Sequence, residues 1–279
     1  MGSASPSPSP AAMMDEKLDP NVDWKALKLV YAPMYSAFDG AHTFQVPVRV
    51  DGASVELSGW KAIPKDAATF DPDPEGGGVM VTIVKGVPEI TIAASNKTIG
   101  GTATLHITVA TPADWEVGKA RYNNGVDFEL PEPPDFSQII DPNFVPPPPP
   151  KNLACNNCHS TGAKYFEVQH TPTQAARFSD DDLSVIFTKG MKPPGIGFRI
   201  FPDPSEVPMV SGLPAFDPVE VYAGFHTWDA SAEEIKGLIV YLRSLTPTGQ
   251  GDILLPDGTY LPPGEIPSNA PGAAGAGGR

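Results

Sequence analysis

The pentapeptide Cys155-Asn156-Asn157-Cys158-His159 contains both cysteines of the 279-residue chain. Its C-x-x-C-H spacing is the one by which proteins attach a c-type haem. On one turn of helix Cys155 and Cys158 lie on the same side, so both thiols reach the two vinyl groups of a porphyrin while His159 binds the iron. The pentapeptide therefore predicts a helical turn at this point, and one covalently attached haem c, with its iron, as the cofactor.

Two other uses of the C-x-x-C spacing are a structural or redox disulfide and half of a zinc site. A zinc site needs four ligands, commonly with a second Cys or His pair at similar spacing, and the chain has only these two cysteines. A thioredoxin-type motif needs a surrounding βαβ pattern, which the flanking sequence lacks. Both alternatives therefore fit less well than haem attachment.

Composition limits the size and the partners of the chain. Its length suggests one or two domains, and 34 prolines with 27 glycines require many loops and linkers. The formal net charge of −14 argues against a nucleic-acid partner. An acidic surface suits docking to a basic redox partner protein, although it equally serves solubility.

The sequence contains no apolar run long enough to be a transmembrane segment and no visible export signal. Covalent haem attachment normally occurs outside the cytoplasm, so we expect a periplasmic or cell-surface protein whose export signal precedes the start shown. Residues 1–20 are rich in Ser, Pro and Ala. They resemble the tether that follows a lipid anchor in surface lipoproteins. Residues 1–20 and 251–279 are both expected to be disordered.

Residues 21–110 show the period of two that is typical of β-strands. The runs 42–50 and 53–63 flank Asp51-Gly52, which predicts a hairpin, and Ala103, Leu105, Ile107 and Val109 alternate with polar residues, among them His106. The pattern predicts an all-β sandwich. With Trp60 in an early strand and the runs GVPEITIAAS and GGTATLHITV at the end, this part resembles a bacterial immunoglobulin-like domain.

Residues 111–250 show the period of α-helices. Helix starts are predicted at Thr111-Pro112, at Ser179 and at Ser231, where capping residues precede apolar residues at helical spacing. A proline-rich insertion at 126–151 separates the first of these helices from the cysteines. The predicted fold class is therefore a multidomain one, with an N-terminal all-β immunoglobulin-like sandwich followed by an all-α domain.

The order of parts in 112–250 resembles a monohaem c-type cytochrome. It has a first helix with Gly and an aromatic residue, C-x-x-C-H, a short acidic-start helix ending in Gly, a loop, and a last helix reading EEIKGLIVYLRSL. The resemblance implies a small cytochrome c-like domain in which the first and last helices cross at Gly118. This crossing would place Gly118 and Tyr122 against Leu238, Tyr241 and Leu242. The insertion before Cys155 departs from the usual spacing of the family.

The resemblance also implies iron ligands. His159 would be the proximal ligand. His226 is the preferred distal ligand, because it lies five residues before the cap of the last helix, near the place where related cytochromes carry a methionine. Met191 and Met209 are the alternatives, and an open sixth position also remains.

Five further residues are candidate haem contacts. Pro172 lies about where the family has a proline at the proximal face, and an ordinary loop proline is the other interpretation. The groups able to hydrogen-bond or neutralise propionates are Arg199, Trp228, Tyr241 and Arg243. His170 is expected to hydrogen-bond in a loop.

Three functions remain open at this point. The first is an extracytoplasmic one-electron carrier with no catalytic residues, rather than an enzyme. The second is a haem-based sensor or peroxidase-like enzyme with an open sixth iron position. The third is a surface binding protein that acts through its immunoglobulin-like domain.

Overall fold

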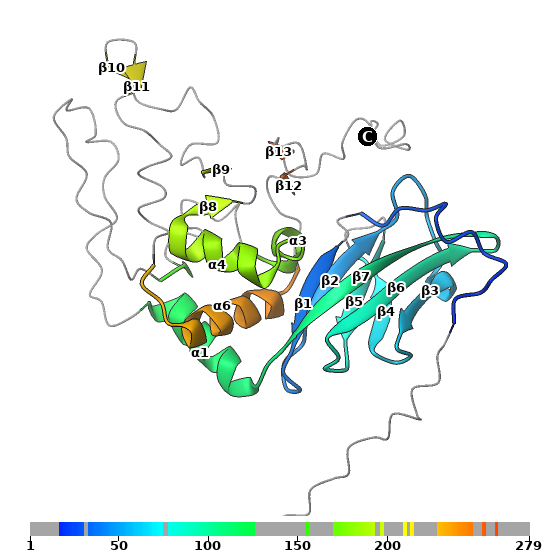
Figure 1. The fold of residues 1–279 in the computed structure, drawn as a ribbon, viewed down its shortest axis with the longest axis horizontal. Helices are drawn as coiled ribbons and strands as arrows, with labels where there is room; N and C mark the ends of the chain where they lie inside the picture. Colours follow the sequence, from blue (N-terminus) through cyan, green and yellow to red (C-terminus); the bar gives the residue numbers. More distant parts are fainter. Residues whose placement is uncertain are drawn as a thin grey trace, which may run out of the picture. The chain divides into compact units, whose positions relative to one another are not determined.

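The computed structural model describes eleven segments of the chain. They are residues 17–30, 33–74, 78–125, 154–156, 170–192, 196–197, 209–210, 213–214, 228–247, 253–254 and 260–261. The chain divides into two compact units, with the boundary between Val109 and Ala110. Unit 1 holds Met1–Val109 and Glu265–Arg279, and unit 2 holds Ala110–Gly264 (Figure 1). The predicted domain limits stay predictions.

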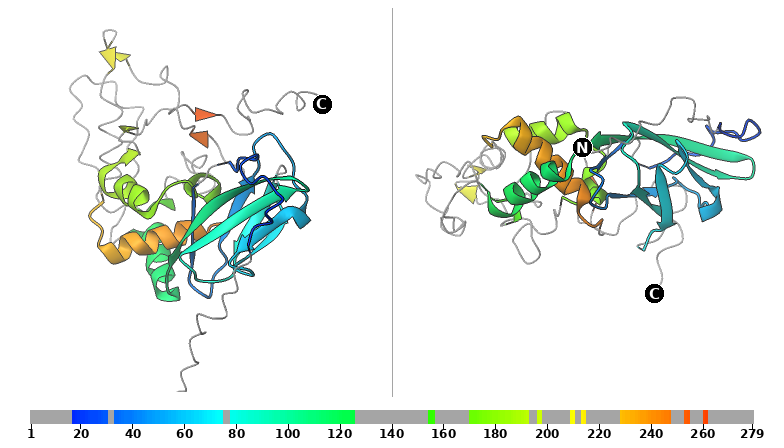
Figure 2. Two further views of the ribbon diagram at one scale, coloured as in Figure 1. Left: turned by 45° about the vertical axis from the view of Figure 1, so that its right-hand side comes forward. Right: turned by 90° about the horizontal axis from the view of Figure 1, so that it is seen from below.

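Unit 1 contains two β-sheets. The first has the order β1-β7-β6-β3 and is formed by Met34–Phe38, Ile99–Val109, Glu89–Asn96 and Trp60–Ile63. The second has the order β2-β5-β4 and is formed by Gln45–Arg49, Gly78–Ile83 and Ala68–Pro72. All neighbouring strands are antiparallel except β1 and β7, which are parallel. The two sheets form two layers (Figure 2).

The core of unit 1 follows from the alternation of side chains along the strands. In β7, Ala103, Leu105 and Ile107 are buried whereas His106 is half-buried on the other face. The buried valines and isoleucines of β2, β5 and β6 come from both sheets. Val109, predicted to share the inward face, is 49% exposed because it ends the strand.

The hairpin predicted at Asp51-Gly52 is wrong. The strand before it, β2, pairs with β5, and the strand after it, β3, pairs with β6 in the other sheet. A turn does occur at Asp51, and Gly52 has φ +66°, a conformation that suits glycine. The chain then runs through the short 3₁₀ helix η2 (Leu57–Gly59) before β3, so it crosses from one sheet to the other.

Unit 2 contains four described α-helices. They are α1 (Pro112–Asn124), α3 (Pro172–Ala175), α4 (Asp180–Lys189) and α6 (Ala232–Ser244). The N-caps Thr111, Ser179 and Ser231 each form a capping box with the acid three residues later, as predicted. No described helix is long and apolar enough to cross a membrane.

The predicted fold class is wrong, because the part expected to be an all-α cytochrome c-like domain is not all helical. Its described residues also form two two-stranded sheets: β8 (Met191–Lys192) with β9 (Ile196–Gly197), and β10 (Met209–Val210) with β11 (Leu213–Pro214). A third such pair, β12 (Ile253–Leu254) with β13 (Tyr260–Leu261), lies within residues 251–279. Over the whole described chain, strands outnumber helices. Prolines recur through residues 193–218, and proline has no N–H to donate and clashes with the preceding helical turn. Such a sequence does not continue a helix, and the loop expected after α4 contains two short strand pairs among its described residues.

Helices α1 and α6 cross at glycines, as the sequence resemblance implied. A Cβ built on Gly118 would overlap the carbonyl of Gly237, and a Cβ built on Gly237 would lie 2.7 Å from the carbonyl oxygen of Asp114. Only glycine therefore permits the two backbones to approach this closely. Helix α6 also contacts α3 and α4, so it is central to unit 2 (Figure 1).

Candidate functional site

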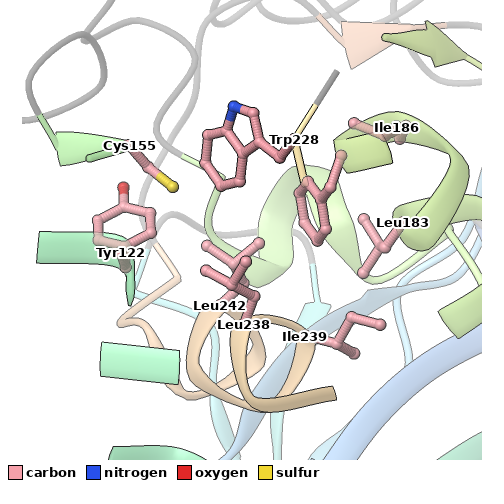
Figure 3. Packing of buried hydrophobic residues seen from close by; sticks show 9 residues of the cluster. Tyr122, Cys155, Leu183, Ile186, Trp228, Leu238, Ile239 and Leu242 are labelled. Carbon is pink, nitrogen blue, oxygen red and sulfur yellow. The ribbon is translucent and has the colours of Figure 1, made fainter. Parts of the chain in front are cut away.

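Cys155 lies in the apolar core of unit 2. Its exposed fraction is 7%, and it belongs to one cluster of buried residues with Tyr122 from α1, Trp228, and side chains of α4 and α6. Figure 3 shows the Cys155 sulfur directed toward the Tyr122 and Trp228 rings. The remaining buried members of the cluster are Leu183, Ile186, Phe187, Leu238, Ile239 and Leu242. The first cysteine of the pentapeptide therefore faces the kind of apolar wall that a porphyrin requires.

Trp228 is held against α4 by two contacts. Its ring stacks on Phe187 with a centroid distance of 6.1 Å and an interplanar angle of 18°. Its backbone N–H donates to the Phe187 carbonyl at 3.0 Å. A buried aromatic pair of this kind stabilises by about 0.5–1.5 kcal/mol beyond area burial, so the indole has a defined place in the wall.

Tyr122 contacts aromatic rings on two sides. Its ring centroid is 5.2 Å from that of Tyr241 and 6.3 Å from that of His170, which lies edge-on. Burial raises the pKa of the Tyr122 phenol well above its usual value, and the nearby Cys155 and Tyr241 raise it further. The phenol is therefore neutral at any working pH and acts as an apolar ring with one hydroxyl.

Asn156 connects the pentapeptide to the crossing helices. Its Nδ2 donates to Asn123 Oδ1 at 3.2 Å, and Asn123 Nδ2 lies 3.4 Å from the hydroxyl of Tyr241. Asn123 Nδ2 also donates to the Lys119 carbonyl at 2.9 Å, which fixes the amide on α1. Asn156 is thus hydrogen-bonded to α1, and its partner Asn123 lies close to Tyr241 of α6.

Two arginines are almost fully buried in unit 2. Arg121 is 2% exposed, and its guanidinium lies over the Trp228 ring, 5.2 Å from the ring centroid. Arg243 is 1% exposed, pairs with Asp180 Oδ1 at 2.6 Å, and donates from Nη2 to the Phe178 carbonyl at 3.1 Å. The contact with Asp180 joins α6 to the first turn of α4.

Sequence reasoning missed Arg121, Asn123 and Asn156. A charged side chain on a helix is ordinarily expected to be exposed. The available signal for Arg121 was its helical phase, because it follows Gly118 by three residues and so shares the face that crosses α6.

The structure brings only some of the predicted site residues together. Trp228 lies in the cluster with Cys155, and Tyr241 packs against its edge. Arg243 lies at the α4 end of α6 instead, paired with Asp180. Pro172 is buried at the first position of α3, directly after Thr171.

The other predicted site residues are not placed by the structure. Cys158, His159, Arg199 and His226 lie outside the described residues. Of Met191 and Met209 the structure describes only the strand positions, at the first residue of β8 and of β10. Among the described residues, no group of three or more His, Cys, Asp or Glu side chains is arranged to hold a metal ion.

Comparisons with known proteins add little. No family model and no curated protein matches the chain. Among solved structures it is similar to titin domain M7, at 13% identity over 30% of this chain and 94% of that domain, with a TM-score of 0.23. At this TM-score the similarity carries no argument about fold or function.

Proposed function

We propose that this protein is an extracytoplasmic electron carrier that holds one covalently attached haem c. Cys155 and Cys158 would form the thioether bonds and His159 would bind the iron. The observation that carries the proposal is the burial of Cys155 among aromatic and aliphatic side chains of α1, α4 and α6. Because a structural cysteine is also commonly buried, it is the C-x-x-C-H spacing that makes this burial support a haem.

The residues around Cys155 fit a haem in two respects. The thiol points into an apolar cluster that includes Tyr122 and Trp228. Such a cluster excludes water from one face of a porphyrin. The guanidinium of Arg121 lies beside Trp228 within the same part of the unit, where a cation favours a bound anion such as a propionate.

The bound haem would supply one-electron redox chemistry, and the chain would supply its position and surroundings. Leu238 and Leu242 of α6, both nearly fully buried, form the base of the apolar wall. The hydrogen bonds from Asn156 through Asn123 hold the start of the pentapeptide against α1. His226 is the preferred distal ligand, with Met191 and Met209 as alternatives.

Two features support the proposal that this chain is related to monohaem c-type cytochromes. One is the C-x-x-C-H pentapeptide, and the other is the close contact of Gly118 with Gly237 between α1 and α6. A place outside the cytoplasm is proposed because covalent haem attachment normally occurs there. The net charge of −14 supports a basic one-electron carrier protein as the partner.

Absorption spectra of the oxidised and reduced full chain, produced with an export signal in a host that attaches haem c, test this proposal. We expect a low-spin spectrum in both states. A methionine-to-iron charge-transfer band would show that the distal ligand is a methionine rather than His226. A high-spin spectrum would contradict the electron-carrier function in favour of an open iron position.

A further inference from the structure

Three aromatic rings connect the neighbourhood of Cys155 with the surface of unit 2. Trp115 in α1 is half-buried, Tyr241 in α6 is half-buried, and Tyr122 in α1 is 6% exposed. The centroids of Trp115 and Tyr241 are 5.3 Å apart, and those of Tyr241 and Tyr122 are 5.2 Å apart. We call these three residues the aromatic ladder.

The inner end of the ladder lies beside the predicted point of haem attachment. Tyr122 and Cys155 belong to the same buried cluster, and the Cys155 sulfur is directed toward the Tyr122 ring (Figure 3). A thioether at Cys155 would place a bond to the porphyrin next to the last ring. Three rings in contact, followed by the covalent thioether, would give a continuous path of electronic coupling. Coupling through separate aliphatic side chains would be weaker.

The outer end of the ladder is held in place by several groups. Trp115 Nε1 donates to Ser244 Oγ at 2.6 Å, and Ser244 Oγ donates to the Tyr241 carbonyl at 2.7 Å. Lys119 Nζ lies 4.8 Å from the centroid of the Trp115 ring. A half-buried indole whose N–H is bonded has a fixed position from which it can contact another molecule.

We propose that Trp115, Tyr241 and Tyr122 form the route by which an electron passes between the haem attached at Cys155 and a one-electron carrier protein that binds at the Trp115 end. This inference rests on the proposed function. The donor loses one electron and the acceptor gains it, while no bond forms or breaks and no proton moves. The rings act as a bridge and carry no charge of their own.

A second aromatic contact provides an internal control. Phe187 and Trp228 belong to the same cluster as Cys155, but they lead toward α4. Glu116, next to Trp115 in α1, and Asp181, in the first turn of α4, are both exposed. A photoactive ruthenium complex attached to a cysteine at position 116 therefore sends an electron into the cluster from the α1 side. The same complex at position 181 sends it from the α4 side.

The test is flash photolysis of the haem-loaded full chain labelled at Glu116→Cys or at Asp181→Cys. We expect Tyr241→Leu to slow electron transfer from the label at position 116 several-fold, with little effect from position 181. Tyr241→Phe should retain the parent rate, because it keeps the ring.

Several results would overturn the inference. One is an unchanged rate from position 116 in Tyr241→Leu, and another is equal slowing from both labels, which would indicate a disturbed haem site. As a measurement independent of electron transfer, nuclear Overhauser effects should connect the ring of Tyr241 with those of Trp115 and Tyr122; their absence would also contradict it. Failure to obtain covalent haem at all would instead reject the proposed function, so the two failures are distinguishable.

Discussion

Replacing Gly118 with alanine should weaken the contact between α1 and α6. The added Cβ would overlap the Gly237 carbonyl and lie 2.8 Å from the backbone nitrogen of Leu238. These neighbours are backbone atoms, which cannot rotate away as a side chain does, so the helices must separate. Overpacking of this kind costs about 1–3 kcal/mol.

Helix propensity acts in the opposite direction. Alanine is favoured over glycine within a helix by about 1 kcal/mol, so a purely local effect would make Gly118→Ala more stable than the parent. We expect the steric term to exceed this gain and the free energy of unfolding to fall by about 1–2 kcal/mol. Ala120→Gly, at an exposed position of the same helix, measures the propensity term alone.

The measurement is chemical denaturation followed by far-ultraviolet circular dichroism, since the described α-helices all lie in unit 2. Gly118→Ala should unfold at lower denaturant concentration than the parent with a similar slope. A midpoint equal to or above that of the parent would refute the close helix crossing.

Three further predictions concern stability. Leu238→Ala empties a fully buried position and should lower the free energy of unfolding of unit 2 by about 2–5 kcal/mol in the same assay; a smaller loss would mean that the cluster is loosely packed. Asp180→Ala removes the carboxylate that pairs with the buried Arg243 and should cost roughly 1–3 kcal/mol, and a neutral outcome would contradict the role of this pair. Burial raises the pKa of the Asp39 carboxyl, but two backbone N–H groups and the His42 ring bond to it and hold its pKa below the ordinary value of 3.8. The contribution of the ionised Asp39 carboxyl to the stability of unit 1 is therefore complete above that value and is lost as the pH falls through the lowered pKa. Asp39→Asn should make the stability of unit 1 less dependent on pH in the acid range. An unchanged pH dependence would contradict this role of Asp39.

Local signals in the sequence were the ones that predicted structure correctly. Thr111, Ser179 and Ser231 were recognised as helix starts because a capping box depends on residues only three apart. The alternation in β7 likewise placed Leu105 inward and His106 outward. Such features need no knowledge of distant parts of the chain.

Pairing and burial between distant segments were not predictable in this way. Asp51-Gly52 has the composition of a hairpin turn, which would pair β2 with β3. Instead β2 pairs with β5, some thirty residues further along the chain. The all-α expectation treated the proline-rich stretch after α4 as a loop, whereas its described residues form two short strand pairs, β8 with β9 and β10 with β11. The burial of Arg121 depends on Trp228, which lies far away in sequence.

For the candidate site, the sequence predicts the chemistry, and the structure describes the surroundings of Cys155. The C-x-x-C-H spacing predicts haem attachment at Cys155, but it does not predict the amide contact of Asn156 with Asn123 or the ring contacts of Tyr122. Those contacts depend on how α1 and α6 cross, which only the folded chain defines.

The most direct test of the account is the intact mass of the full chain after denaturation, when it has been produced with an export signal in a host that attaches haem c. We expect one haem to remain bound to the denatured parent chain and none to remain on the double variant Cys155→Ser, Cys158→Ser. A parent chain that carries no haem under these conditions would contradict the central claim.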